Sequence, residues 1–395
     1  MRSSTSLPGR FWCLIAATFL GFLGFGTVLP ALAPHVRHDL GGSDRTVGFV
    51  IGTFSVVALC SRLFAGRLAD HKGRKRAFLT GLGSCTLAGV AYLLPWGIGG
   101  IYFGRALQGI GEACLYIGAA AWAVEVAGVH RSARALGYLS SGIWGGIAAG
   151  PLIGQVLGSF NNAARFQIFA ALTAATLLSQ VPEDYRPSAH PRPRGWMRRS
   201  LIPAGFAVGF VNVHYPVITG FLILSLARRP HAGPAAFSAY AALVLLSRFF
   251  LGGLPDRIHP RITFYTGLVC MALGLGILAT GPILIWAVIA AGLLGFGFSF
   301  PWSSVASTVL RRTPPGDHGS AVSLLSAFYD LFVGISSFSA GLLANRFGYA
   351  SAFVLAIASL GAAAIVGRFV FQSADHSDPN SKPAALEPVP VETED

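Results

Sequence analysis

Long apolar runs, separated by short polar segments, fill the chain from residue 11 to residue 371. One α-helix needs about 20 apolar residues to cross a bilayer. Such runs occur at 11–33, 45–69, 77–97, 100–124, 134–158, 166–181, 200–227, 235–254, 263–281, 283–310, 319–343 and 349–371. The pattern therefore predicts an all-α integral membrane protein with twelve transmembrane helices.

A charged motif recurs within this apolar pattern. Residues 61–70 read SRLFAGRLAD and residues 247–256 read SRFFLGGLPD, a displacement of 256 − 70 = 186 positions. Such a repeat is typical of secondary transporters, in which the substrate site lies between two halves. The expected parts are two pseudo-symmetric six-helix halves at 1–181 and 200–372, a cytoplasmic linker at 182–199 that is rich in Pro and Arg, and an acidic, disordered tail at 373–395.

The composition agrees with a membrane protein. Hydrophobic residues make up 53% of the chain and charged residues only 11%, whereas an ordinary soluble domain carries about 25% charged residues. The sequence contains no HExxH motif, no nucleophile elbow and no histidine cluster, so an integral membrane enzyme is not expected. No metal and no cofactor are predicted, and the cysteines have no ligand spacing: Cys13, Cys60, Cys85, Cys114 and Cys270.

The basic residues are distributed unequally between alternate loops. With a cytoplasmic N-terminus, the inner loops hold fifteen Lys and Arg residues and the outer loops hold six. This positive-inside pattern predicts a multi-pass protein of a bacterial inner membrane with both termini in the cytoplasm. The net charge of +13 then reflects topology, so nucleic acid is not an expected partner. The expected partners are the lipid bilayer, a small-molecule substrate and protons, and the expected state is a monomer.

The N-terminus imitates a secretory signal. Arg2 and Arg10 precede an apolar run that ends near Ala31 and Ala33. The run at 11–33 is longer than the usual signal core of about 7–15 residues, and its removal would leave the first half one helix short. We therefore expect this segment to remain as the first transmembrane helix.

The first copy of the repeat extends into a basic loop. Residues 66–76 read GRLADHKGRKR, which resembles the G-x-L-A-D-x-x-G-R-K signature between the second and third helices of the major facilitator superfamily. The resemblance implies a twelve-helix transporter with a gating motif, here Gly66, Asp70, Gly73, Arg74 and Lys75, with Asp256 in the degenerate second copy. The alternative is that the basic cluster only anchors the loop at the anionic cytoplasmic leaflet.

The fourth predicted helix carries charged residues. Residues 105–113 read RALQGIGEA and resemble the R-x-x-Q-G-x-G-x-A motif of the same superfamily, which implies a proton-coupling role for Arg105. Glu112 lies outside that motif, and its candidacy rests on its place in an apolar helix. The two residues are separated by about 10 Å along a helix, so other partners are expected. A structural polar network is the alternative.

Asp330 is the most isolated acid of the sequence, within the eleventh predicted helix. The repeat relates it to Trp144 in the fifth, since 330 − 186 = 144. An acid inside the membrane is a candidate proton or cation site, although it can also be a structural acid with a satisfied partner. Arg62 and Arg248 are expected to snorkel toward the inner surface or to cap the gates.

The fifth predicted helix contains a small-residue motif. Residues 146–154 read GIAAGPLIG and resemble the G-x-x-x-G-P-x-x-G motif that the superfamily uses mainly in exporters and drug/proton antiporters. The motif residues are Gly146, Gly150, Pro151 and Gly154, and Gln155 replaces the following glycine of the family pattern. Since small residues at this spacing also serve ordinary helix packing, that alternative remains open.

Polar and aromatic residues of several helices are candidates for the substrate cavity: Gln108, Tyr116, Trp144, Asn212, His214, Tyr215, Trp302 and Tyr329. Of these, His214 interrupts the seventh helix just before Pro216, and the alternative for this lone membrane histidine is a satisfied packing group. The resemblance is closest to bacterial sugar-efflux and drug/proton antiporter permeases. It implies a proton-coupled exporter of a small polar or amphipathic molecule that works by alternating access. The alternative is proton-coupled uptake of an organic acid, a sugar or a siderophore-like compound.

Overall fold

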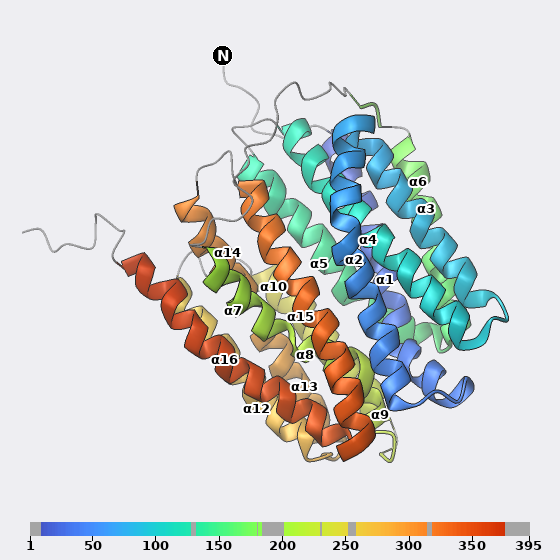
Figure 1. The fold of residues 1–395 in the computed structure, drawn as a ribbon, viewed down its shortest axis with the longest axis vertical. Coiled ribbons are helices and arrows are strands. Elements are labelled where there is room, and N and C mark those ends of the chain that lie inside the picture. Colours follow the sequence, from blue (N-terminus) through green and yellow to red (C-terminus); the bar gives the residue numbers. More distant parts are fainter. Residues whose placement is uncertain are drawn as a thin grey trace, which may run out of the picture.

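The structure is a computed structural model that describes residues 9–127, 132–179, 181–183, 201–229, 231–251, 258–313 and 318–375. These residues form a bundle of helices in which the N-terminal half lies beside the C-terminal half (Figure 1). The helices of the N-terminal half are α1 (Gly9–Pro34) with its π-helical extension η1 (His35–Asp39), α2 (Asp44–Lys72), α3 (Arg74–Leu93), α4 (Gly97–Ala127), α5 (Ser132–Leu157) and α6 (Phe160–Ser179).

The C-terminal half contains two spans that are broken into pieces. Its seventh span consists of α7 (Ile202–Asn212), α8 (His214–Val217), η4 (Ile218–Leu222) and α9 (Ile223–Ser225). The remaining helices are α10 (Ala232–Leu251), α12 (Pro260–Ala279), the broken span of α13 (Leu284–Phe298) and α14 (Pro301–Arg312), α15 (His318–Phe347) and α16 (Tyr349–Asp375).

The helices match the predicted spans. Counting each broken span once, the described residues contain twelve long helical segments, six in each half. Seven of the segments are long and apolar enough to cross a membrane by length and composition alone. The all-α, twelve-helix prediction is confirmed. Helix α16 extends to Asp375, so the first three residues of the tail predicted at 373–395 are helical and the boundary of the tail is wrong by that much. The rest of the tail and the linker after Glu183 lie outside the described residues.

Breaks in two spans have a local cause. The predicted interruption near His214 is present, because α7 ends at Asn212 and a π-helical turn follows Pro216. A proline inside a helix removes a backbone donor and disturbs the preceding turn. The break between Phe298 and Pro301 follows the same rule, but the apolar pattern of 283–310 did not predict it.

Small residues let helices of the N-terminal half approach closely. Helix α1 packs against α5, and a Cβ atom added at Gly26 would lie only 2.8 Å from the Cα atom of Gly150. A Cβ atom at Gly146 would lie 2.5 Å from the carbonyl oxygen of Phe19. The predicted G-x-x-x-G-P segment of α5 therefore forms a close helix contact, as the packing interpretation requires.

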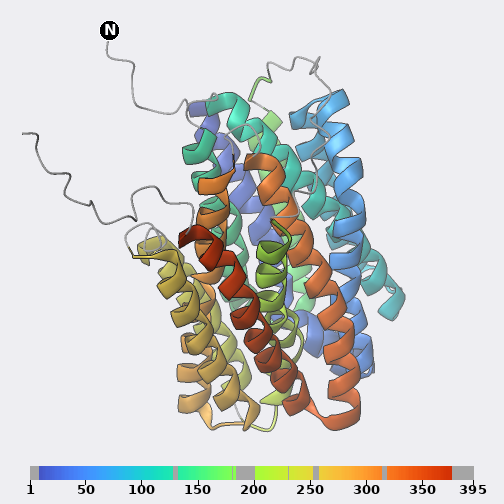
Figure 2. The ribbon, with the colours of Figure 1, turned by 60° about the vertical axis from the view of Figure 1, so that its left-hand side comes forward.

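The two halves meet along two helix pairs, α2 with α15 and α5 with α10. Figure 2 shows the halves side by side from a second direction. In the first pair, a Cβ atom at Gly48 would lie 2.7 Å from the Cα atom of Gly341. This contact lies near the beginning of α2 and the end of α15, which we call the η1 end of the bundle. The opposite end, where α2 turns into α3, is the motif end.

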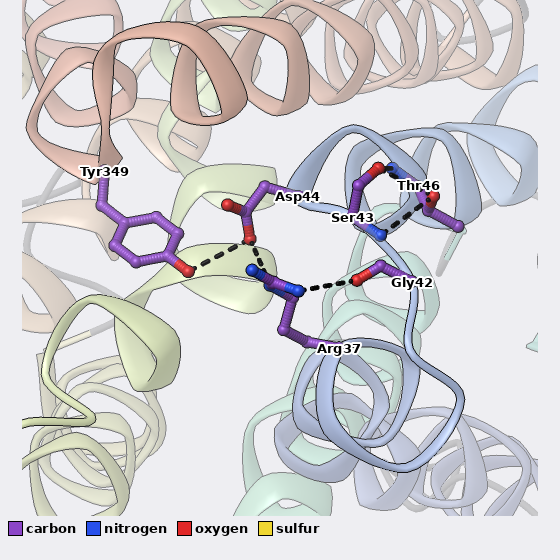
Figure 3. A network of polar contacts seen from close by, with 6 residues as sticks. All are labelled: Arg37, Gly42, Ser43, Asp44, Thr46 and Tyr349. Carbon is purple, nitrogen blue, oxygen red and sulfur yellow. Dashed lines mark hydrogen bonds and ion pairs between the residues drawn. The ribbon is translucent and has the colours of Figure 1, made fainter.

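A polar network also joins the halves at the η1 end (Figure 3). Asp44 Oδ1 lies 3.3 Å from Arg37 Nε and accepts a hydrogen bond of 3.1 Å from the hydroxyl of Tyr349. Arg37 also donates to the carbonyl oxygen of Gly42. Since Asp44 begins α2 and Tyr349 begins α16, the network connects the N-terminal half to the C-terminal half.

Candidate functional site

A cavity lies between the two halves. Helices α1, α2, α4 and α5 line it from the N-terminal half, and α8, η4, α14 and α15 line it from the C-terminal half. Most of the lining is aromatic or aliphatic, with four charged side chains: Arg62, Arg105, Glu112 and Asp330. A cavity lined by both halves is the arrangement that alternating access requires.

Arg62 of α2 forms an ion pair with Asp330 of α15 across the two halves. Its Nε and Nη2 atoms donate to the same carboxylate oxygen, Asp330 Oδ2, at 2.8 and 2.5 Å. Glu112 of α4 lies on the other side, with its Oε1 atom 3.9 Å from Arg62 Nη2. Arg62 and Asp330 are buried, with exposed fractions of 8% and 3%, and Glu112 is partly buried, with an exposed fraction of 13%.

The charges of this cluster do not cancel. With both carboxylates ionised and Arg62 positive, the buried cluster carries one net negative charge, which a single added proton neutralises. Within the described part of the chain, Arg62 Nη1 and Glu112 Oε2 are buried without a hydrogen-bond partner. The cluster thus has one free donor, Arg62 Nη1, and one free acceptor, Glu112 Oε2, among the described residues.

A second contact across the halves lies beside the cluster. Ser326 of α15 donates a hydrogen bond of 3.1 Å to the hydroxyl oxygen of Tyr116 on α4. The guanidinium of Arg62 lies 5.4 Å from the centre of the Tyr116 ring. Tyr116 therefore contacts both the cation and the opposite half.

Arg105 has neutral partners. Its Nη1 atom donates to Gln108 Oε1 at 2.6 Å, and Nε donates to the carbonyl oxygen of Val50 at 3.3 Å. Gln108 in turn bonds to Tyr92 and to Gln167. Of the three residues predicted to couple protons, Glu112 and Asp330 are therefore brought together through Arg62. Arg105 belongs to a separate polar network that contains no acid among the described residues.

Arg248 of α10 is the repeat counterpart of Arg62, since 248 − 62 = 186. Its guanidinium lies 4.5 Å from the ring centre of Trp144 on α5 and 5.3 Å from that of Phe298. Trp144 is itself the repeat counterpart of Asp330. We call the contact of α2 with α15 the first crossing and the contact of α5 with α10 the second crossing. At the first crossing an arginine of the N-terminal half contacts a carboxylate of the C-terminal half. At the second crossing an arginine of the C-terminal half contacts an indole of the N-terminal half.

Of the two alternatives for Arg62 and Arg248, snorkelling toward the inner surface is wrong, and capping of the gates stays a prediction. Both guanidinium groups instead lie between the halves, because Asp330 and the Trp144 ring offer contacts that repay part of the cost of burial. The prediction missed them as site residues. A usable signal was present, since the displacement of 186 that relates Asp330 to Trp144 also relates the two arginines.

Five of the eight predicted cavity residues line the cavity: Tyr116, Trp144, Tyr215, Trp302 and Tyr329. The other three are buried elsewhere. Gln108 belongs to the network of Arg105, Asn212 donates to the carbonyl oxygen of Val208, and His214 lies between the carbonyl oxygen of Val211 and the hydroxyl of Tyr240. Each of these three side chains therefore has at least one partner inside the protein, although Asn212 Oδ1 is buried without a hydrogen-bond partner among the described residues.

The motif at the α2–α3 turn ties helices of one half together. Gly73 has a φ of 101°, a conformation that suits glycine, and separates α2 from α3. Glu183 Oε1 accepts hydrogen bonds from the backbone N–H groups of Arg74 and Lys75 at 2.6 and 3.1 Å. A carboxylate in this position stabilises the N-terminus of α3. Glu183, near the start of the predicted linker at 182–199, thus contacts the N-terminus of α3, and the linker itself stays a prediction.

The side chains of the motif reach two further helices. Arg74 forms an ion pair with Glu125 of α4, and Lys75 Nζ donates to the carbonyl oxygens of Ser179 and Val181 at the end of α6. Gly66 and Asp70 lie half-buried toward the end of α2. Asp256, the acid of the second copy, lies outside the described residues.

Comparison with known proteins identifies the relatives of this chain. The model of the Major Facilitator Superfamily matches residues 14–229 and 202–393. An uncharacterized MFS-type transporter of Salmonella typhimurium is 28% identical over 376 residues, covering 89% of this chain and 94% of the relative. One of Burkholderia mallei is 28% identical over 393 residues, covering 94% of each chain.

Two solved transporters share the fold. The nucleoside transporter NupG superposes with a TM-score of 0.70 at 13% identity, covering 93% of this chain and all of that chain. The peptide transporter POT superposes with a TM-score of 0.74 at 14% identity, covering 95% of this chain and 96% of that chain. At this level of identity the likeness concerns the fold alone.

Proposed function

The chain belongs to the Major Facilitator Superfamily, and from this premise we propose that it exports a small polar or amphipathic molecule in exchange for protons. It is a multi-pass membrane protein and a secondary transporter of a small molecule, and it is not an enzyme. Proton coupling, the direction of transport, the inner membrane and the cytoplasmic position of both termini are parts of the proposal. The observation that carries it is the ion pair between Arg62 and Asp330 across the two halves.

The ion pair links proton binding to the movement of the halves. The halves cannot part at α2 and α15 without separating Arg62 from Asp330, and an unpaired buried charge is costly. Protonation of Asp330 makes that side chain neutral. Arg62 then keeps Glu112, 3.9 Å away on α4 of its own half, as its counter-ion. Neither half carries an uncompensated charge after separation, so one proton permits the conformational change.

Release of the proton reverses the step. When Asp330 faces the side of lower proton concentration, it ionises and attracts Arg62 again, which draws α2 and α15 together. Glu112 and Asp330 are thus the proposed proton-exchanging acids, and Arg62 is the cation that exchanges between them. Arg105 is proposed to act on them through the field in the shared cavity, since its direct partners are neutral.

Export is supported by the G-x-x-x-G-P segment, whose resemblance is to exporters. A specific observation favours the second candidate, proton-coupled uptake of an organic acid. The charged groups at the cavity and its crossings are three guanidinium groups, Arg62, Arg105 and Arg248, against two carboxylates. Because each bound proton makes this region more positive, a proton and an anion would favour each other's binding, which is the behaviour of a symporter.

The motif at the α2–α3 turn is proposed to gate the motif end. Its arginine and lysine hold α3, α4 and α6 as one body, so that α2 moves with them when the halves rock. Asp70, in the last turn of α2, is the proposed gate acceptor. Asp70→Asn is expected to impair transport while the protein remains in the membrane, and wild-type flux from a well-folded variant would reject the role.

Transport assays in vesicles of both orientations distinguish the candidates. Inverted vesicles containing the protein are acidified inside and screened with a panel of labelled sugars, organic acids and amphipathic drugs. An exporter accumulates its substrate under these conditions, and a protonophore abolishes accumulation. Accumulation only in right-side-out vesicles with an inward proton gradient would establish uptake instead. Accumulation that a protonophore leaves intact would contradict proton coupling.

A further inference from the structure

The arginine of the second crossing has an unused hydrogen-bonding edge. Nε and Nη2 of Arg248 are buried, and no acceptor among the residues that the structure describes lies within hydrogen-bond distance of either atom. Its contacts are the faces of Trp144 and Phe298. An aromatic face attracts a cation but does not accept the in-plane N–H groups of the guanidinium edge. The two rings therefore stabilise the positive charge of Arg248 but leave its Nε and Nη2 atoms without hydrogen-bond acceptors among the described residues.

The repeat counterpart indicates what this edge is suited to hold. In Arg62 the same two atoms, Nε and Nη2, both donate to the carboxylate of Asp330. Trp144 occupies the corresponding place before Arg248, and an indole ring cannot accept these bonds. A carboxylate supplied from outside the chain would complete the second crossing in the way that Asp330 completes the first.

The surroundings suit a flat apolar body attached to that carboxylate. The Trp144 ring centre lies 6.1 Å from that of Trp302 and 5.9 Å from that of Tyr329, and Tyr215 lies 6.3 Å from Tyr329. These four side chains line the cavity. Aromatic walls of this kind bind flat apolar groups by stacking and burial.

Trp144 contacts the guanidinium face only while the halves are together at this crossing. Trp144 belongs to α5 of the N-terminal half, and Arg248 belongs to α10 of the C-terminal half. If the halves part along α5 and α10, the indole moves away from the guanidinium, which then faces the opened space without a counter-charge. An unpaired guanidinium at a low-dielectric wall binds an anion strongly.

We propose that Arg248, which lies beside the cavity against the lining residue Trp144, is the anion-binding residue of the transport path and that the transported molecule is a small organic carboxylate with a flat apolar body. The inference rests on the proposed role of the cavity as the transport path, but it holds for either direction of transport. Trp144 is the side chain that the carboxylate replaces at the guanidinium, and Trp302 and Tyr329 contact the apolar body.

Binding of matched probes to the purified full-length protein tests this assignment. The probes are 2-naphthoate and its neutral analogue 2-naphthamide, measured by equilibrium dialysis in detergent. We expect the protein to bind 2-naphthoate more tightly than the amide. Arg248→Gln should weaken 2-naphthoate binding by roughly tenfold or more, the size of a lost charge-assisted hydrogen bond, and leave the amide unchanged.

Two further variants serve as controls. Arg45 also lies over an aromatic ring, 5.2 Å from the centre of Phe49, but Arg45 is exposed and Phe49, unlike Trp144, does not line the cavity. Arg45→Gln should therefore bind both probes like the wild type. Arg248→Lys keeps the charge but loses the planar fork, and it should retain part of the preference. This second variant keeps the test valid if Arg248→Gln does not fold.

Three results would overturn the assignment. They are equal binding of acid and amide by the wild type, an unchanged preference in Arg248→Gln, and a preference that disappears only in Arg105→Gln. Because dialysis requires neither a proton gradient nor turnover, the outcome is separate from that of the proposed function. Loss of proton-driven flux in vesicles together with intact Arg248-dependent binding would reject proton coupling and keep the anion site.

Discussion

The two crossings between the halves begin with equivalent arginines and end with different partners. At the crossing of α2 and α15, Arg62 meets a carboxylate that can gain or lose a proton. At the crossing of α5 and α10, Arg248 meets Trp144, which cannot. The repeat therefore preserves the position of the cation and changes the group that faces it. The consequence is a molecule with one crossing that senses protons and one crossing that can accept an anion.

This difference assigns proton coupling to one crossing and substrate binding to the other. If both crossings held carboxylates, each would need its own proton before the halves could part, and no cation would remain for a substrate. If both held indoles, no group at the crossings would respond to protons. Because Asp330 and Trp144 differ, the crossing of α2 and α15 can couple transport to protons while the crossing of α5 and α10 binds the substrate.

The largest expected effect is that of Asp330→Asn on proton-driven flux. The amide keeps the shape of the side chain but cannot exchange a proton, so uphill transport should fall by about 100-fold or more, the order of a missing proton-transfer group. Substrate counterflow, which needs no net proton movement, should remain. Measurement of both fluxes in proteoliposomes tests this.

Asp39→Asn is the matched control for that experiment, because Asp39 is an exposed acid that pairs with His35 in η1 and lies outside the cavity. It should transport like the wild type. Uphill flux preserved in Asp330→Asn would mean that the second acid, Glu112, is sufficient, which Glu112→Gln in the same background would reveal.

The second expected difference concerns stability. Asp330→Ala removes the closest partner of a buried guanidinium, which typically costs roughly 3 kcal/mol of unfolding free energy. Trp144→Leu removes a cation–π contact worth roughly 1 kcal/mol. Unfolding of the purified variants in mixed micelles by added denaturing detergent gives both values. Equal losses of unfolding free energy in the two variants would contradict the prediction that the ion pair of Arg62 stabilises the protein more than the cation–π contact of Arg248.

The sequence predicted the bundle well because its signals are local. Apolar runs of membrane-spanning length and the displacement of 186 residues are visible without any neighbour in space, and the break at His214 and Pro216 follows from backbone chemistry. The break before Pro301 was missed because the surrounding run is uniformly apolar. Local patterns also identified Asp330 and Trp144 as repeat counterparts.

The partners of the site residues could not be predicted, because they depend on which helix faces meet. The contact of Arg62 with Asp330 spans 268 positions of sequence, and the cap of α3 by Glu183 spans more than 100. Asn212 and His214 looked like cavity residues because they are polar in an apolar helix. In the fold, each contacts a backbone carbonyl oxygen of its own helix turn.

A smaller effect separates Arg62 from Arg105. Arg62 contacts both acids, so Arg62→Gln should change the pH at which transport is half-maximal. Arg105 contacts neutral groups and acts on the acids only through the shared cavity, so Arg105→Gln should change this pH by a smaller amount. Initial rates measured across a pH series check this, and a change of profile in Arg105→Gln as large as that in Arg62→Gln would contradict the difference between the two arginines.

The smallest effect is expected at the η1 end. Tyr349→Phe removes one hydrogen bond to Asp44, a group that Arg37 still pairs, and a bond of this kind contributes about 1 kcal/mol. Transport rates should change by no more than several-fold, and the proton-to-substrate ratio should stay constant. A changed proton-to-substrate ratio would show that the η1 end, and not only the crossing of Arg62 and Asp330, couples transport to protons.

The most direct test of the central claim is infrared absorption of protonated carboxyl groups in the purified protein, followed as a function of pH. The account predicts a carboxyl band that disappears as the pH rises, that is lost in the Asp330→Asn/Glu112→Gln double variant, and that persists in Trp144→Phe and Asp39→Asn. A band of full size in the double variant would contradict the claim that the crossing of Arg62 and Asp330 holds the proton.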